Sequence, residues 1–169
     1  RACLFDREGR KLTGRSFSAV ADTALKNWPA EDIYEGDVFI WNDPYQSEGG
    51  IGGLATLCVC VPIFYRQKLA AFSLTACHLD DIGGAAPAAF RADCTDIFQE
   101  GLLVPPIKLF ERGAMNREAY RIICRNSRLP DILQVDIDAA ISACRAGGER
   151  VRELFERFGD EVVLGTFEG

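Results

Sequence analysis

Two apolar runs joined by a short polar connection limit most strongly what this chain can fold into. Residues 57–64 and 69–76 are mostly hydrophobic, and a polar tetrapeptide, residues 65–68, separates them. Apolar runs of this length with a polar connection between them are typical of buried strands. The sequence therefore predicts that the two runs pair with each other as mostly buried strands.

Three further segments are predicted to be extended. Residues 2–12 have turn residues at their centre, where Gly9 can adopt a positive φ, and this predicts a hairpin. Residues 38–41 are a short apolar strand that follows a Gly-Asp turn. Residues 104–109 contain two consecutive prolines, which a helix interior does not accept, and we interpret them as an extended segment at the edge of a sheet.

Three segments are predicted to be helical. Residues 18–28 form a short helix that ends before a proline. Asn116 has the side chain of an N-cap and begins a helix through residue 126. Apolar residues then recur at helical spacing from Pro130 to Phe158, and Gly159 has the residue type of a helix C-cap.

Together these segments predict an α/β fold, with a mixed sheet in the first two-thirds of the chain followed by two C-terminal helices. The 169 residues suffice for one domain with a core, and 48% of them are hydrophobic and 26% charged, as in ordinary globular proteins. The chain begins at Arg1 and enters a strand-like run at once. We interpret residues 1–169 as a single, partial domain of a larger subunit.

Charge and cysteine usage exclude several classes of protein. The net charge is -6 and no Lys/Arg stripe is present, which argues against nucleic acid or an anionic membrane as a partner. No apolar segment approaches the roughly 20 residues of a membrane span. The seven cysteines are irregularly spaced and lie mostly in apolar runs, as expected for thiols in a reducing compartment. The sequence therefore predicts a cytoplasmic protein.

Two patterns suggest a metal or a nucleotide, and each has a simpler explanation. Cys58-x-Cys60 is shorter than the usual C-x2-C zinc spacing, and two residues that far apart share one face of a strand. The glycines at positions 49, 50, 52 and 53 form a flexible loop, but they lack the spacing and the lysine of phosphate-binding motifs. We favour two core thiols over a zinc site, and a loop without a nucleotide over a nucleotide loop.

The candidate chemistry gathers around His78, the one histidine in the chain. Asp80 and Asp81 follow it at the predicted exit from the sheet, where functional loops often lie. A neutral imidazole beside carboxylates can bind a divalent metal or relay a proton, and Asp43 and Glu48 are further carboxylates nearby in sequence. The alternative is a structural histidine that bonds to a neighbouring carboxylate.

Four segments carry a resemblance to a known family. They are G-D-V-F-I-W-N-D-P-Y at residues 36–45, the glycine-rich loop, C-H-L-D-D-I-G-G at residues 77–84, and D-I-F-Q-E-G-L-L-V-P-P-I-K-L at residues 96–109. Together they resemble the hydantoinase B/oxoprolinase family, and the resemblance extends over residues 2–159. That family supplies one subunit or domain of ATP-dependent hydantoinases and 5-oxoprolinases, and a subunit of acetone and acetophenone carboxylases.

The resemblance also implies site residues. In the carboxylase members, two histidines and an aspartate from these segments are the kind of set that holds a divalent metal. His78 matches one of the histidines, whereas Gly53 stands where the other histidine is expected and Thr56 where the aspartate is expected. We take His78 and Asp80 as candidate metal ligands. The candidate catalytic carboxylates are Asp43 and Asp81.

The resemblance implies a division of labour between subunits. An A-type partner subunit would bind ATP and phosphorylate the small-molecule substrate, because this chain has no ATP-binding motif of its own. The first hypothesis is that the chain is part of the B-type catalytic subunit of an ATP-dependent cyclic-amide hydrolase. One alternative is a subunit of an ATP-dependent ketone carboxylase. The other is a non-catalytic paralogue or fragment that keeps only the fold and the subunit interface.

Overall fold

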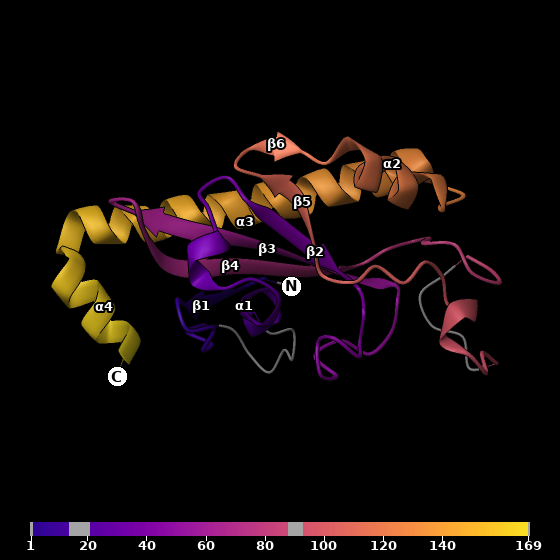
Figure 1. The fold of residues 1–169 in the computed structure, drawn as a ribbon, viewed down its shortest axis with the longest axis horizontal. Helices are drawn as coiled ribbons and strands as arrows, with labels where there is room; N and C mark the ends of the chain where they lie inside the picture. The colour runs from indigo at the N-terminus through magenta and orange to yellow at the C-terminus, as the bar shows by residue number, and fades with distance from the viewer. Residues whose placement is uncertain (1, 14–20, 88–92, 169) are drawn as a thin grey trace.

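The chain folds into a twisted sheet with a long helix along one of its faces (Figure 1). This computed structural model describes residues 2–13, 21–87 and 93–168. The described strands form one sheet in the order β1-β4-β3-β2-β5-β6, and neighbouring strands are antiparallel throughout. Their bounds are β1 Ala2–Asp6, β2 Val38–Trp41, β3 Thr56–Tyr65, β4 Lys68–His78, β5 Ile107–Glu111 and β6 Ala114–Met115.

The predicted pair of apolar strands is confirmed as the β3–β4 hairpin near the middle of the sheet. Its register pairs Thr56 with His78 at the open end. At the closed end Arg66 and Gln67 both have positive φ angles, 48° and 64°. Left-handed conformations at two consecutive turn residues match the right-handed twist of the flanking strands. The hairpin thereby fixes which residues emerge together at its open end.

Both faces of the hairpin are covered, which explains why its sequence is apolar without alternation. Leu57 and Val59 lie in a core cluster with residues of the long helix α3, Pro130–Phe158. Cys58 and Cys60 point to the opposite face, where α1, Asp22–Asn27, contributes to a second cluster. The interpretation of these two cysteines as core thiols is confirmed, because both are fully buried and burial raises the pKa of each.

The long helix approaches the sheet closely at one glycine. A side-chain Cβ at Gly147 would lie 2.8 Å from Ser73 Oγ on β4, whereas a Cβ at Gly148 would meet only Ile63, at 3.5 Å. Gly147 therefore sets the distance between helix and sheet. As predicted, α3 ends at Gly159, which has a φ of 80° and donates its N–H to Phe155 O.

Other features of the sheet differ from the sequence predictions. The sheet predicted as mixed is antiparallel in all described pairs, and the expected edge strand at residues 104–109 begins at Ile107 and lies inside the sheet. It is interior because Arg112 and Gly113 turn the chain back, so that β6 forms the edge. The predicted N-terminal hairpin consists of β1 with a single bridge between Phe5 and Lys11.

The helices agree with the predictions in most places. Asn116 caps α2, Arg117–Arg125, by accepting a hydrogen bond from Ala119 N. A third C-terminal helix, α4 Asp160–Glu168, follows the two that were predicted. Part of the helix predicted at residues 18–28 lies outside the described residues. Two short 3-10 helices, η1 Ala30–Asp32 and η2 Ile97–Gln99, complete the described elements. Within the described part of the chain, no helix has both the length and the hydropathy to cross a membrane.

The close approach at Gly147 predicts opposite effects for two adjacent substitutions. Gly147→Ala should lower the free energy of unfolding by about 1 kcal/mol, because the clash with Ser73 Oγ outweighs the gain in helix propensity. Gly148→Ala should raise it by up to about 1 kcal/mol, because its Cβ would fit. Urea unfolding of both variants measures this. In a Ser73→Ala background the cost at Gly147 should disappear, and a cost that persists there would contradict the clash.

Candidate functional site

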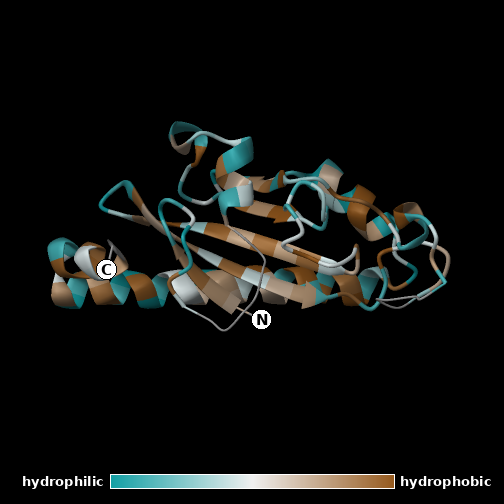
Figure 2. Ribbon diagram, turned by 90° about the horizontal axis from the view of Figure 1, so that it is seen from below, coloured by the Kyte–Doolittle hydropathy of each residue, from teal (hydrophilic) through white to brown (hydrophobic). Residues whose placement is uncertain are grey.

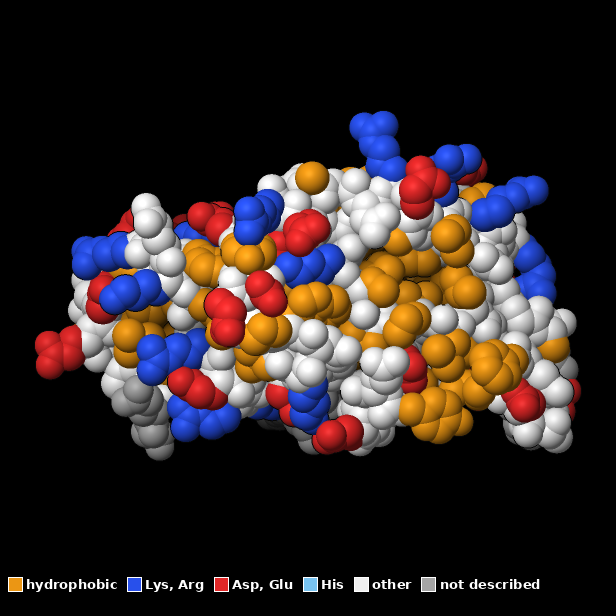
Figure 3. All heavy atoms as spheres, viewed as in Figure 1, with side chains coloured by type: hydrophobic (Ala, Val, Ile, Leu, Met, Phe, Trp, Pro, Cys, Tyr) orange, Lys and Arg blue, Asp and Glu red, His pale blue; other side chains and the backbone are white. Residues whose placement is uncertain are grey.

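The candidate site lies at one end of the sheet, where three neighbouring strands begin or end. Strand β2 ends at Trp41, β3 begins at Thr56 and β4 ends at His78. Because β2 and β4 both run antiparallel to β3, these three points meet at the same edge. The structure therefore brings the Asn42-Asp43 segment, Thr56 and His78 to one end of the sheet. In Figure 3, apolar side chains gather over this loop-bearing part of the visible face.

His78 contacts the residue that stands at an expected ligand position. Its Nδ1 lies 3.0 Å from Thr56 Oγ1, directly across the ladder. Gly53 is close to Thr56, since Thr56 N donates a hydrogen bond to Gly53 O at 3.1 Å. The three positions implied by the family resemblance thus converge. The Thr56 hydroxyl orients the imidazole of the exposed His78.

The donors around His78 do not fit a divalent metal. Thr56 supplies a neutral hydroxyl and Gly53 has no side chain, so two of the three implied positions lack a charged or imidazole donor. In the described ranges, no three or more His, Cys, Asp or Glu side chains come together in a way that could hold a metal ion. Glu48 forms an ion pair with Lys26 at 2.9 Å, which engages its carboxylate on the α1 side of the glycine-rich loop.

Asp43 is buried and holds the turn after β2. Its Oδ1 accepts hydrogen bonds from the backbone N–H groups of Tyr45 at 2.8 Å and Gln46 at 3.2 Å. Its carbonyl accepts further bonds from the backbone and hydroxyl of Ser47. The described contacts of Asp43 therefore stabilise the loop. Its assignment as a catalytic group stays a prediction.

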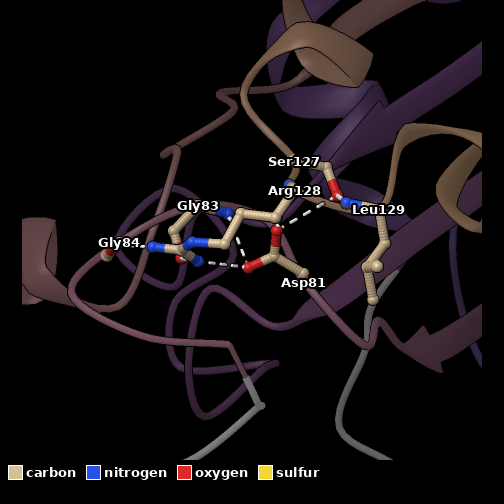
Figure 4. Close-up of polar contacts among 6 residues, drawn as sticks. All are labelled: Asp81, Gly83, Gly84, Ser127, Arg128 and Leu129. Carbon is tan, nitrogen blue, oxygen red and sulfur yellow. Dashed lines mark hydrogen bonds and ion pairs between the residues drawn. The ribbon is translucent and has the colours of Figure 1, made fainter.

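Asp81 is also buried, and it ties the loop after β4 to the corner between α2 and α3 (Figure 4). Its Oδ1 accepts a hydrogen bond from the Arg128 guanidinium at 2.6 Å. Its Oδ2 accepts from the backbone N–H of Arg128 and from the Ser127 hydroxyl. The same guanidinium donates to the carbonyls of Gly83 and Gly84. This cluster holds the Gly-Gly turn against the helical corner.

These contacts control the ionisation of Asp81. Burial by itself raises its pKa, but the backbone N–H and the positive charge of Arg128, together with hydrogen bonds from Arg128 and Ser127, outweigh burial. The pKa of Asp81 is therefore held below its ordinary value, and the carboxylate stays ionised at neutral pH.

Asp80 is exposed and its charge is felt by α3. Burial, and next the negative charge of Asp80, raise the pKa of Asp136 on that helix. The two carboxylates line one shallow depression together with Asp81 and Ile132. No described contact joins Asp80 to His78, and the assignment of Asp80 as a metal ligand stays a prediction.

The sequence did not reveal the role of Asn42. Its amide nitrogen donates to the carbonyls of Leu54 at 2.7 Å and Leu102 at 2.9 Å, and its Oδ1 accepts from Val104 N at 2.6 Å. This fully buried side chain joins the end of β2, the glycine-rich loop and the segment before β5. The position of Asn42 before the Asp-Pro turn was the one available signal, and it indicated only a turn.

An open cavity of about 330 Å³ lies beside this loop. That volume falls at the lower end of the range for small-molecule sites. Glu100 helps to shape it by accepting a hydrogen bond from Leu54 N at 3.1 Å. The cavity is lined by Pro44, Tyr45, Gly52, Gly53, Cys94, Thr95, Asp96, Ile97 and Glu100. The sheet end therefore offers space for a small molecule next to Gly53.

The contacts of Asn42 predict a large cost for an isosteric change. Asn42→Asp would point a carboxylate oxygen at two carbonyl oxygens in a buried site, and it should lower the free energy of unfolding by about 3 kcal/mol. Chemical denaturation measures this. Asn116→Asp is the matched control, since aspartate caps a helix as well as asparagine. Equal stability of the two variants would show that the Asn42 bonds are dispensable.

The low pKa of Asp81 predicts a pH-dependent contribution to stability. Because its pKa is lower in the folded than in the unfolded chain (about 3.9), its contribution is present above roughly pH 4 and is lost as the pH falls through the folded-state pKa. Asp81→Asn should therefore cost about 2 kcal/mol at pH 7.

Thermal unfolding between pH 7 and pH 3 tests this contribution. The difference between the wild type and Asp81→Asn should shrink below about pH 4. The exposed Glu156→Gln is the control. A difference that does not change with pH would contradict the assignment of this pH dependence to Asp81.

Comparison with known proteins identifies the family of the chain. The sequence model of the hydantoinase B/oxoprolinase family matches residues 2–169. The beta subunit of caprolactamase from Pseudomonas jessenii is 33% identical over 133 residues, which are 79% of this chain and 22% of that protein. The B-type subunit of a putative D-/L-hydantoinase from Pseudomonas sp. (strain NS671) is 34% identical, again over 79% of this chain and 22% of that protein.

A structural comparison agrees. The crystal structure of ATP-dependent caprolactamase from Pseudomonas jessenii superimposes with a TM-score of 0.84 at 28% identity, covering 99% of this chain and 30% of that one. The delta subunit of acetophenone carboxylase from Aromatoleum aromaticum is 28% identical over 81% of this chain and 20% of that protein. The chain thus spans about a fifth of the length of these curated relatives. It belongs to the hydantoinase B/oxoprolinase family.

Proposed function

We propose that this chain is part of the B-type subunit of an ATP-dependent enzyme that hydrolyses cyclic amides. The observation that carries the proposal is its similarity, at 33% and 34% identity, to subunits of a caprolactamase and of a putative hydantoinase. The cavity beside Gly53 supports a small-molecule substrate. An A-type partner subunit would bind ATP and activate the substrate. The buried thiols are compatible with a cytoplasmic setting.

The chemistry of this chain would be to hold the activated substrate and to manage a proton. A neutral imidazole at His78, oriented by the Thr56 hydroxyl, can accept a proton from an attacking water. Asp43 and Asp81, predicted as catalytic, would act as positioning residues, since each binds backbone N–H groups of a loop at the site. No step here is routed through a metal, because the donors around His78 do not fit one.

Two alternatives remain, and a specific observation favours each. The 28% identity to the delta subunit of acetophenone carboxylase favours carboxylation of a ketone. Gly53 and Thr56 at implied ligand positions favour a subunit that keeps the fold and the interface without the chemistry. The first alternative predicts consumption of bicarbonate. The second predicts an assembled complex without turnover of either substrate class.

The test is ATP-dependent turnover by the full-length subunit together with its ATP-binding partner. Cyclic amides, such as lactams and hydantoins, should be hydrolysed, and His78→Ala should lower turnover by about 10²-fold by removing the proton acceptor. The control is Lys68→Ala, at the opposite end of the β3–β4 hairpin, which should leave turnover unchanged. Normal turnover by His78→Ala would contradict the proposed role of the imidazole.

Elemental analysis of the same proteins separates an acid–base role from a metal-binding role. Because His78 has a hydroxyl as its described partner, we expect His78→Ala to leave the content of divalent metal unchanged. The loss of one equivalent of metal in His78→Ala would show instead that His78 is a ligand.

A further inference from the structure

The outer face of α3 carries a long stripe without charged side chains. The helix packs its inner face on the sheet, and Figure 2 shows it along the lower side of the molecule with the sheet above it. On the outer side, Leu129, Ile132 and Val135 are 40%, 44% and 67% exposed. Small exposed residues continue the same face: Ala139, Ser142, Ala143 and Ala146. Residues 129–146 span about 27 Å of helix axis at 1.5 Å per residue.

The stripe is unusual in a chain with this charge content. Charged residues make up 26% of the sequence, and the last turns of the same helix carry exposed Glu149, Arg150, Glu153, Glu156 and Arg157. A solvated helix face normally carries such residues along its whole length. Small residues let a second helix approach closely, and the large apolar residues at one end of the stripe provide buried contact area. The first half of α3 thus has two contact faces, and only the inner one is covered by described residues.

The charges that border the stripe indicate what covers the outer face. Asp138 and Arg145 are both exposed and lie on the same flank, two turns apart. On the other flank Asp136 precedes Arg150. Acidic residues therefore border the first part of the stripe and basic residues follow. A parallel copy of the helix would meet like charges, whereas an antiparallel copy would meet opposite charges on both flanks.

We propose that this stripe is the contact of a two-fold symmetric dimer, in which α3 packs antiparallel against α3 of a second copy. With the axis near Ser142, Asp138 of each copy lies opposite Arg145 of the other, and Ala139 lies opposite Ala143. The contact is isologous, because the same residues meet from both sides. It is independent of the reaction that the subunit performs.

The test is the molar mass of the full chain by light scattering during gel filtration, over a range of concentrations. The wild type should be a dimer. Asp138→Arg and Arg145→Asp should each raise the dissociation constant at least about tenfold by placing like charges opposite each other. The double variant Asp138→Arg/Arg145→Asp should restore the dimer, because the exchanged charges are again complementary.

Controls and contrary outcomes are defined on the same helix. Arg157→Asp lies beyond the stripe and should leave the mass unchanged, and circular dichroism should show that every variant is folded. Ala139→Arg should give a monomer, because a long charged side chain prevents close approach. A monomeric wild type overturns the proposal and leaves the stripe to a different polypeptide. A double variant that stays monomeric, or a dimer insensitive to Ala139→Arg, overturns it as well.

Discussion

Two-sided burial of the β3–β4 hairpin is the constraint on which the rest of the structure depends. Since adjacent residues of a strand point to opposite faces, a strand that is apolar at consecutive positions needs a cover on both sides. The helix α3 covers one face and α1 contributes to the cover of the other. At about 25 cal/mol per Å² of apolar surface, these two clusters are the main source of stability. The candidate site is built at the open end of this rigid hairpin.

The loops at that end are held by buried polar side chains. Asn42 binds backbone groups of two loops, Asp43 binds the backbone of its own turn, and Asp81 binds the corner before α3. Each of these groups would be costly to bury without its partners, so each loop has one favoured conformation. The position of Thr56 against His78 then follows from the hairpin register, and the cavity beside Gly53 is bordered by segments that have been fixed in this way.

Local features of this architecture could be predicted from the sequence, and long-range ones could not. The hairpin, the cap at Asn116 and the end of α3 at Gly159 depend on residues within a few positions of one another. The interior position of β5 depends on a turn at Arg112 and Gly113 and on pairing with a strand about 70 residues earlier. Likewise, Arg128 lies 47 residues from Asp81, and no local pattern connects the two. The site residues were found as a group, but their partners were not.

The same helix links the core, the site and the outer stripe. Its inner face packs on β3 and β4, its N-terminal corner is tied through Arg128 to the loop after β4, and its outer face carries exposed apolar side chains. Gly147 lets this helix lie close to Ser73, which fixes its height above the sheet. A helix held at three places along its length cannot shift at one end without disturbing the others. A partner on the outer stripe would therefore bind an element whose position is already set by the hairpin, and it would lose little conformational entropy on binding.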